Sequence, residues 1–433
     1  MERIALHYLK KWKGKINRKP LIVSGARQVG KTWLINEFGK TEYEQTVYVN
    51  FETSKSLQAL FSTDFNISRI ISALQIETDI QIQAENTLII LDEIQEAKGG
   101  LTSLKYFCEN APEYHVVAAG SLLGVALHNA QSFPVGKVDF LELYPLTFTE
   151  FLLALKQKPL ADLLESEDWV LIKTFKEKYI QLLRQYYYVG GMPEVVLSFV
   201  QKNDFNEVRN LQRNILLSYE QDFSKHAPNE IVPRIRALWN SIPAQLSREN
   251  KKFIYGLVKK GARAKEYELA LSWLVDCGLI YQINRISKPG IPLKAYEDLS
   301  AFKLYMVDVG LLGAMSNMDV KTLLEGNVIF QEFKGSLTEQ YVLQQLIPNP
   351  DKSIYYWSAE NAAAEIDFVV QFAGKIIPME VKAEENLKAK SLKSYHQKYN
   401  PELAFRLSMS DYRKEDWLTN VPLYAIGKID RLV

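Results

Sequence analysis

Two glycines, a lysine and a threonine close to the start of the sequence have the types and the spacing needed to bind phosphate. They belong to the segment GARQVGKT, which has the pattern G-x-x-x-x-G-K-[ST]. Glycines let backbone N–H groups turn inward around phosphate oxygens, Lys31 can reach the β- and γ-phosphates, and Thr32 can be a ligand of Mg²⁺. The residues expected to contact a nucleotide are Gly25, Ala26, Arg27, Gln28, Val29, Gly30, Lys31 and Thr32.

The elements on either side of this loop support the phosphate-binding interpretation. Leu21 to Ser24 is a short apolar run typical of a buried strand, and the apolar residues that follow Lys31 are spaced as in a helix. The N-terminus of such a helix adds a favourable partial positive charge for phosphate. The pattern by itself also fits a glycine-rich turn that matches by chance, so a second element is needed to decide.

A pair of carboxylates supplies that second element. Thr87 to Leu91 has the composition expected of a parallel strand covered on both faces, and Asp92 and Glu93 follow it directly. Asp92 can hold the Mg²⁺ shell, and Glu93 can polarise an attacking water. With both elements in this order, the sequence predicts binding of ATP and Mg²⁺. Hydrolysis also requires stabilisation of the transition-state charge, and neither Arg27 nor Lys137 is a clear arginine finger.

A third polar position follows the next predicted strand. His115 to Ala119 is that strand, and Gly120 and Ser121 stand at its end. Ser121 could sense the γ-phosphate, and a strand-terminating turn is the equally good alternative. Strands that alternate with helices predict a parallel sheet in an α/β fold, with ligands at the carboxyl ends of the strands.

Composition sets the broad class of the protein. The chain has 433 residues, of which 47% are hydrophobic and 24% charged, which predicts an ordinary globular protein of two to four domains. The net charge of +1 does not by itself indicate nucleic acid. Cys108 and Cys277 have no zinc-ligand spacing and predict reduced thiols in a cytoplasmic protein. No signal peptide is expected, because charges interrupt the apolar run at the N-terminus. No membrane-spanning stretch is expected either, because the longest apolar run is too short.

A second set of chemically active residues lies near the other end of the chain. Two predicted strands form a hairpin there, and their alternation places Asp367, Glu380 and Lys382 on polar faces. Asp367 and Glu380 could hold one or two Mg²⁺ ions, Lys382 could position a water, and Glu339 from the preceding helix could complete the metal shell. Taken singly, Glu380 and Lys382 also fit an ordinary surface pair.

The middle of the chain contains the sharpest basic excess. Ser247 to Glu268 carries seven Lys or Arg residues against three Glu. A helix over Ala264 to Cys277 follows, and then a predicted hairpin that returns through Phe302 to Val307. Helices followed by a hairpin predict a winged helix, whose basic residues suit DNA phosphates or base edges. A packing or oligomerisation module is the alternative role for this region.

The chain as a whole resembles a family of AAA+-type ATPases of bacteria and archaea. The resemblance rests on GARQVGKT, LIILDE, AAGS, the segment from Val135 to Phe148, and the later GGMPE of Gly190 to Glu194. It implies a helical lid, a winged helix and a C-terminal nuclease-like domain. In related signal-transduction ATPases a Gly-x-Pro element covers the adenine, so the resemblance implies that Pro193 contacts the base. A helix-ending turn is the simpler interpretation of the same residues.

The C-terminal set resembles the catalytic residues of PD-(D/E)XK nucleases, in their Holliday-junction-resolvase-like branch. The resemblance assigns metal binding to Glu339, Asp367 and Glu380 and catalysis to Lys382, although Ile366-Asp367 lacks the usual leading proline. Nuclease folds are also reused for binding alone.

The expected fold is therefore α/β, with a P-loop AAA+ core at 1–155, a helical lid at 156–225, a winged helix at 226–325 and a restriction-endonuclease-like domain at 326–433. We expect ATP hydrolysis, which needs Mg²⁺, to control a metal-dependent nuclease that acts on DNA. The alternative is a nucleotide-gated, signalling-type switch that binds DNA or partners without cleavage. A homo-oligomer is compatible with either function.

Overall fold

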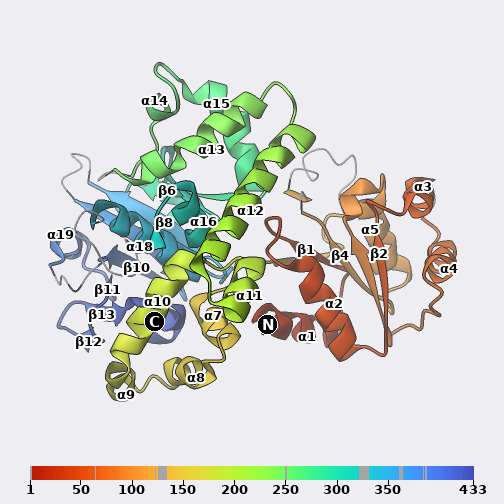
Figure 1. Ribbon diagram of the computed structural model, residues 1–433, viewed down its shortest axis with the longest axis horizontal. Helices are drawn as coiled ribbons and strands as arrows, with labels where there is room; N and C mark the ends of the chain where they lie inside the picture. Colours follow the sequence, from red (N-terminus) through yellow and green to blue (C-terminus); the bar gives the residue numbers. More distant parts are fainter. Residues whose placement is uncertain are drawn as a thin grey trace. The chain divides into compact units, whose positions relative to one another are not determined.

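The computed structural model divides the chain into two compact units (Figure 1). The N-terminal unit comprises Glu2–Tyr144 together with Asp276–Leu279, and the large unit comprises Pro145–Val275 and Ile280–Val433. Each unit contains one sheet. The residues described are 2–63, 65–121, 123–124, 134–248, 251–320, 331–359, 364–383, 385 and 388–433.

The sheet of the N-terminal unit is entirely parallel and has the strand order β2-β3-β4-β1-β5. Its strands are β1 (Leu21–Ser24), β2 (Gln45–Asn50), β3 (Thr87–Asp92), β4 (His115–Ala119) and β5 (Asp139–Glu142). The strand that ends in the carboxylates and the strand that precedes the glycine loop are therefore separated by one strand, β4. This order brings three sequence-distant strand ends to the same edge of the sheet.

Helices cover this sheet, as the apolar composition of its central strands requires. On one face, Ile89 and Leu91 of β3 belong to a core cluster with side chains of α4 and α5, and the alternate residues Leu88 and Ile90 are equally buried. The helices of this unit are α1 (Ala5–Lys13), α2 (Lys31–Glu42), α3 (Lys55–Thr63), α4 (Ile67–Thr78) and α5 (Gly100–Asn110).

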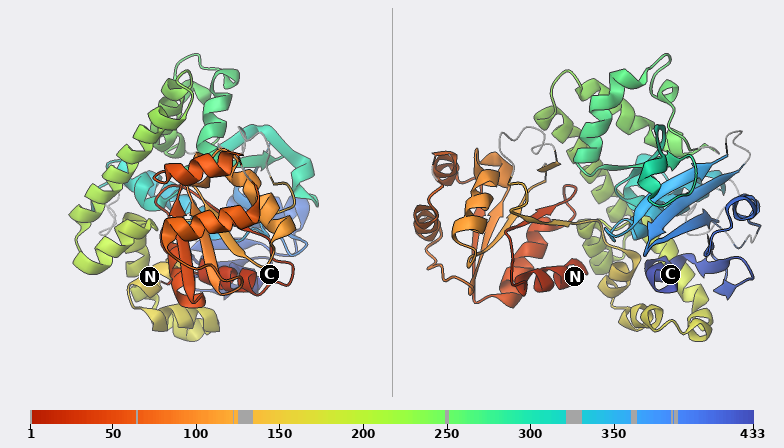
Figure 2. Two further views of the ribbon diagram at one scale, coloured as in Figure 1. Left: turned by 90° about the vertical axis from the view of Figure 1, so that its right-hand side faces the viewer. Right: turned by 180° about the vertical axis from the view of Figure 1, so that it is seen from behind.

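The large unit is built on a mixed sheet of order β12-β13-β11-β10-β9-β8-β6-β7, which the rear view in Figure 2 shows in teal to blue. Its first hairpin, β6 and β7, is the one that the sequence predicts as the wing, and β6 pairs in parallel with β8. The predicted wing thus shares one sheet with the C-terminal strands. The strands are β6 (Ile280–Ile286), β7 (Glu297–Met306), β8 (Ser353–Ser358), β9 (Glu365–Phe372), β10 (Lys375–Val381), β11 (Phe405–Ser408), β12 (Arg413–Lys414) and β13 (Thr419–Pro422).

The first helix of the large unit begins with a capping box. Thr147 caps α7, accepting a hydrogen bond from the Glu150 backbone at 3.3 Å while Glu150 accepts one from the Thr147 backbone at 2.8 Å. The helices are α7 (Phe148–Ala154), α8 (Lys158–Ser166), α9 (Trp169–Thr174), α10 (Lys176–Val189), α11 (Pro193–Lys202), α12 (Phe205–His226), α13 (Val232–Leu246), α14 (Tyr255–Val258), α15 (Ala264–Asp276), α16 (Val309–Met315), α18 (Gln331–Leu346) and α19 (Lys390–Tyr399).

The observed mixed α/β architecture with a parallel sheet agrees with the expected fold class. The succession α13, α14, α15, β6 and β7 is the order expected of a winged helix, but the winged helix, the lid and the nuclease-like domain stay predictions. The predicted boundary between residues 325 and 326 lies outside the described residues. Within the described part of the chain, none of the helices combines the length and the apolar character that a membrane span requires.

Candidate nucleotide-binding site and carboxylate cluster

The glycine loop adopts a backbone that only glycine supports at two of its positions. Gly25 has φ 135° and Gly30 has φ 92°, both in the region that side chains disfavour. At Gly25 a Cβ atom would also lie 2.2 Å from the carbonyl oxygen of Leu143. The loop between β1 and α2 is therefore built around these two glycines, as the sequence predicts.

Lys31 is the first residue of α2, and its side chain folds back into the loop. Its Nζ donates hydrogen bonds to the carbonyl oxygens of Gly25 at 2.9 Å and Ala26 at 2.8 Å. Burial lowers the pKa of Lys31 to about 8, and the charges of Glu93 and Asp92 oppose that shift. A cation is thus held among loop carbonyls, close to two carboxylates.

Thr32 and Asp92 meet directly, although 60 residues separate them. The Thr32 hydroxyl donates to Asp92 Oδ2 at 2.9 Å, and the backbone N–H of Glu93 donates to Oδ1 at 3.0 Å. The Tyr48 hydroxyl donates a further bond to Oδ2 at 2.8 Å. Burial, together with this bond to Asp92, raises the pKa of Tyr48 to about 12. The sequence analysis did not identify Tyr48, whose only signal is a polar group near the end of β2.

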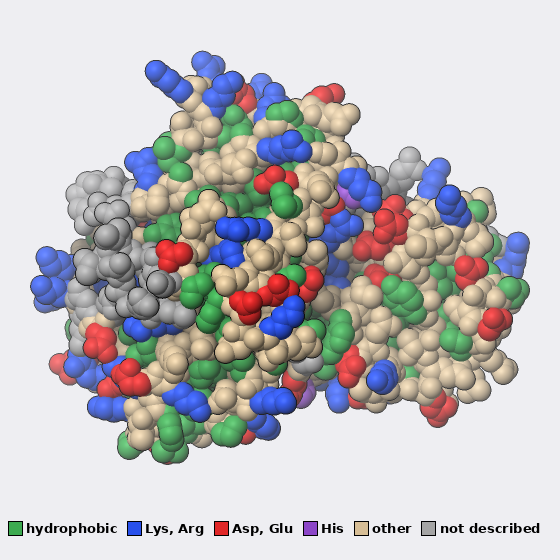
Figure 3. All heavy atoms as spheres, viewed as in Figure 1, with side chains coloured by type: hydrophobic (Ala, Val, Ile, Leu, Met, Phe, Trp, Pro, Cys, Tyr) green, Lys and Arg blue, Asp and Glu red, His purple; other side chains and the backbone are tan. Residues whose placement is uncertain are grey.

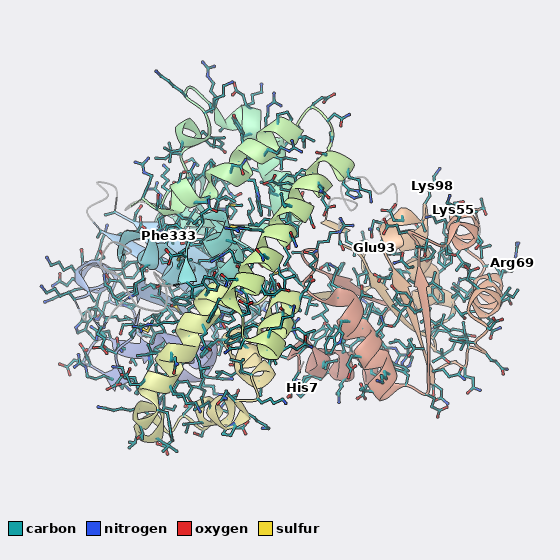
Figure 4. All side chains as sticks on the ribbon, viewed as in Figure 1. His7, Lys55, Arg69, Glu93, Lys98 and Phe333 are labelled. Carbon is teal, nitrogen blue, oxygen red and sulfur yellow. The ribbon has the colours of Figure 1, made fainter. Side chains whose placement is uncertain are left out.

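Glu93, labelled in Figure 4, follows the last residue of β3 in a left-handed conformation with φ 49°. Ser121 donates to it twice, from its hydroxyl to Oε1 at 3.1 Å and from its backbone N–H to Oε2 at 3.3 Å. The Gln95 amide donates to the same Oε2 at 2.5 Å. The structure therefore brings Ser121 to the predicted general base, and it shows Gln95 as a further neighbour that the sequence analysis missed.

Arg27, Lys137 and Pro193 are three other residues that the sequence analysis named as candidates for contact with phosphate or adenine. Arg27 is half-buried in the loop, and Lys137 forms an ion pair with Glu109 at 2.9 Å. Pro193 belongs to the large unit, where it is the first residue of α11. The turn before it is fixed within that unit, because the Gly191 N–H donates to Asp308 Oδ2 at 2.6 Å. The contact of Pro193 with adenine stays a prediction.

In the large unit, the predicted metal ligand Glu339 is buried on α18 and is bonded to cations. Lys251 forms a short ion pair with its Oε1, and the Tyr305 hydroxyl donates to Oε2 at 3.2 Å. Lys303 lies 3.9 Å from the same Oε2 and forms a second ion pair with Glu365. Neither lysine was identified from the sequence.

The remaining predicted ligands are also engaged by protein groups. Asp367 Oδ2 accepts a hydrogen bond from the Val381 N–H at 2.7 Å. Burial, and then the negative charge of Glu339, raises the pKa of Asp367 to about 8. Glu380 forms an ion pair with Lys382 at 2.7 Å and accepts a hydrogen bond from the Leu392 N–H at 3.3 Å. In the part of the chain that is described, no three His, Cys, Asp or Glu side chains are placed to hold a metal ion.

The solved structures that resemble this chain include two at low sequence identity. One is the Walker-type ATPase PABY2304 of Pyrococcus abyssi, at 14% identity and a TM-score of 0.46, covering 72% of this chain and 94% of that chain. The other is the Orc1 protein of Aeropyrum pernix in complex with DNA, at 12% identity and a TM-score of 0.31, covering 72% and 91%. No curated protein matches this chain.

Comparison with family models divides the chain into three matched segments. Residues 180–322 match "Domain of unknown function (DUF8612)", and residues 334–426 match "Domain of unknown function (DUF4143)". Residues 17–152 match the model of an AAA domain. This matched segment contains the glycine loop, Asp92, Glu93 and Ser121, so the predicted nucleotide-contacting residues of the N-terminal unit lie within a segment similar to an AAA domain.

Proposed function

We propose that this protein binds ATP with Mg²⁺ in its N-terminal unit and hydrolyses it. The observation that carries the proposal is the hydrogen bond from Thr32 to Asp92, because it joins the glycine loop to the end of β3 beside Lys31. Hydroxyl and carboxylate oxygens are the ligands that Mg²⁺ prefers, so these two residues fit the ion. Bound Mg²⁺ would supply neutralisation of phosphate charge. Lys31 would give up its hydrogen bonds to the carbonyl oxygens of Gly25 and Ala26 and bind the β- and γ-phosphates instead.

Within this proposal, Glu93 is the general base and Ser121 senses the γ-phosphate. Both oxygens of Glu93 accept hydrogen bonds from neighbouring groups, so the carboxylate is held in one orientation. When the Ser121 hydroxyl turns to phosphate, one carboxylate lone pair becomes available to a water. Glu93→Gln should therefore retain ATP binding and lose turnover.

For the large unit, we propose the switch rather than the nuclease. Exposed basic side chains gather over α14 and α15, at the top of Figure 3, and they suit a DNA backbone; they include Lys259, Lys260, Arg263 and Lys265. Glu339, which was expected to bind metal, is instead paired with Lys251 and lies 3.9 Å from Lys303. We therefore propose that the nucleotide state controls DNA binding without cleavage. The cytoplasmic location and the homo-oligomeric state stay predictions.

One experiment separates the switch from the nuclease. The protein is incubated with branched, single-stranded and duplex DNA plus Mg²⁺ or Mn²⁺, with and without ATP, and both binding and cleavage are measured. We expect nucleotide-dependent binding without cleavage. Cleavage that disappears in Lys382→Ala would support the nuclease and reject the switch. Cleavage that persists in Lys382→Ala would come from a contaminant.

The ATPase proposal has its own test. Binding of a fluorescent ATP analogue and phosphate release are measured for the wild type and for Asp92→Asn. We expect the variant to bind Mg²⁺-ATP more weakly and to lose turnover, because Asp92 orients the Thr32 hydroxyl. Unchanged turnover in Asp92→Asn would reject the assignment.

A further inference from the structure

The carboxylate cluster of the large unit contains its own cations. Lys251 is paired with Glu339, and Lys303 is paired with Glu365 and lies 3.9 Å from Glu339. Lys303 has no exposed surface, Lys251 is 9% exposed and Glu339 is 6% exposed. Buried charges persist in proteins only when they are paired and hydrogen-bonded, so the lysines and carboxylates of this cluster stabilise one another.

The lysines hold the oxygens that a metal ion would need. Glu339 Oε1 is paired with Lys251, while Glu339 Oε2 accepts the Tyr305 hydroxyl at 3.2 Å and has Lys303 at 3.9 Å. Mg²⁺ and its relatives require oxygen ligands at about 2.0–2.6 Å in an ordered shell. Two buried ammonium groups beside those oxygens would repel a divalent cation. The metal implied by the nuclease resemblance therefore does not fit these residues.

We infer that Lys251 and Lys303 take the place of a divalent cation in this cluster, and that the resulting ion-pair network anchors the basic segment after residue 250 to the C-terminal sheet. This goes beyond the proposal that the large unit does not cut DNA, because it assigns the cluster a positive role. Its tests use cation binding, stability and amide exchange, so it can fail independently of the nuclease assay.

The chain that follows Lys251 supports an anchoring role. The Phe253 N–H donates to the Phe302 carbonyl at 2.7 Å, and the two rings stack with centroids 5.2 Å apart. The Gln245 side chain bonds both backbone groups of Ile254, at 2.9 and 3.0 Å. These contacts fix the chain to β7 and α13 directly before α14, which the exposed Lys259, Lys260 and Lys265 follow. Lys251 adds an attachment to α18 through Glu339.

The first test measures divalent cation binding. Mn²⁺ binding to the nucleotide-free, full-length protein is followed by electron paramagnetic resonance in the wild type, Glu339→Gln and Asp367→Asn. We expect the same number of bound ions in all three proteins. A Mn²⁺ ion that the wild type binds and that both variants lose would overturn the inference. Asp92→Asn serves as the control for any ion held by the N-terminal unit.

The second test measures the coupling between Lys251 and Glu339. Thermal unfolding midpoints are compared for Lys251→Met, Glu339→Gln and the double variant. We expect each single change to lower the midpoint by about 5 °C or more, because it leaves a buried charge unpaired, and the double variant to recover most of that loss. Additive losses would overturn the inference, as would a double variant that does not fold.

A third measurement separates anchoring from general stability. Hydrogen exchange is measured for the amides of residues 251–258, of the rest of the large unit and of the N-terminal unit. We expect faster exchange in 251–258 for Lys251→Met, recovery in Lys251→Arg, and no change in the exposed-lysine control Lys260→Met. Equal acceleration throughout the large unit, or none in 251–258, would show that Lys251 does not anchor this segment.

Discussion

The nucleotide site and the carboxylate cluster are built from the same residue types with opposite pairings. In the N-terminal unit, Lys31 bonds to neutral carbonyl oxygens, and Asp92 accepts bonds from hydroxyl groups. In the large unit, lysine and carboxylate are joined directly, as in the pair of Lys251 and Glu339. A lysine held by neutral groups remains available to a phosphate, whereas a lysine paired with a buried carboxylate is already neutralised.

The residue types of a motif therefore do not define its chemistry, because the groups bonded to them differ between the two sites. Four residues of the C-terminal set have the identities that the nuclease resemblance requires, but Glu339 is neutralised by a lysine that lies 88 residues before it. In the nucleotide site, the charges are separated by hydroxyl and backbone groups.

Lys303→Met should cause the largest loss of stability. The change leaves Glu365 without its cation and removes a neighbour of Glu339 in a fully buried setting, which we expect to cost about 3–5 kcal/mol of unfolding free energy. Urea denaturation monitored by tryptophan fluorescence measures this. An unchanged urea midpoint would mean that Lys303 does not stabilise the fold through Glu365 and Glu339. The contrast between the two sites would then not hold.

Lys31→Ala should show the opposite behaviour, with a large effect on ligand binding and a small one on stability. Its side chain has no direct carboxylate bond to lose, but it is the cation expected to meet the phosphates. We expect ATP affinity to fall by about 100-fold, which corresponds to the loss of one or two charge-assisted hydrogen bonds. Isothermal titration with ATP measures it, and Lys98→Ala is a matched control on the same unit. Unaltered affinity would contradict the nucleotide site.

Asp367→Asn should change how stability depends on pH. The pKa of Asp367 is raised to about 8, so the folded protein favours the neutral acid. The contribution of this raised pKa to the free energy of unfolding is fully present below pH 3.8. It is lost as the pH rises through 8, at no more than about 1.4 kcal/mol per pH unit. The variant should therefore gain stability relative to the wild type between pH 5 and pH 9. Parallel stability curves for the two proteins would contradict this.

Tyr48→Phe should have the smallest effect. It removes one of the two hydroxyl donors to Asp92 Oδ2 and leaves the Thr32 bond in place. We expect an increase of about fivefold in the Mg²⁺ concentration that gives half-maximal ATPase activity, since a single hydrogen bond contributes about 1 kcal/mol. Tyr106→Phe is the control. If the Mg²⁺ concentration that gives half-maximal activity were the same in the variant and the wild type, Tyr48 would not contribute to the site.

Most residues of the proposed nucleotide site could be named from the sequence because their signals are local. The glycines, Lys31 and Thr32 lie in one loop, and Asp92 and Glu93 directly follow an apolar strand. Tyr48 could not be found, because its contact depends on the register that pairs β2 with β3. That register is set by the packing of the whole sheet rather than by any short pattern.

Local sequence patterns were not sufficient to predict the bonding partners in the carboxylate cluster. The hairpin of β9 and β10 and the helix that carries Glu339 were predicted. Lys303 lies on β7 and Lys251 in the segment before α14, so only the assembled sheet brings them to Glu339. A lysine inside an otherwise buried strand is the one sequence signal that could have pointed to a buried anionic partner.

The parallel pairing of β6 with β8 also determines where this protein can be divided. A truncated protein that started at residue 326 would lack β6 and β7, and the backbone groups of β8 at Tyr356 and Trp357 would face water unpaired. Exposed strand edges recruit other chains, so self-association would be its first defect. Fusion or subdomain studies should therefore keep the hairpin together with the C-terminal strands.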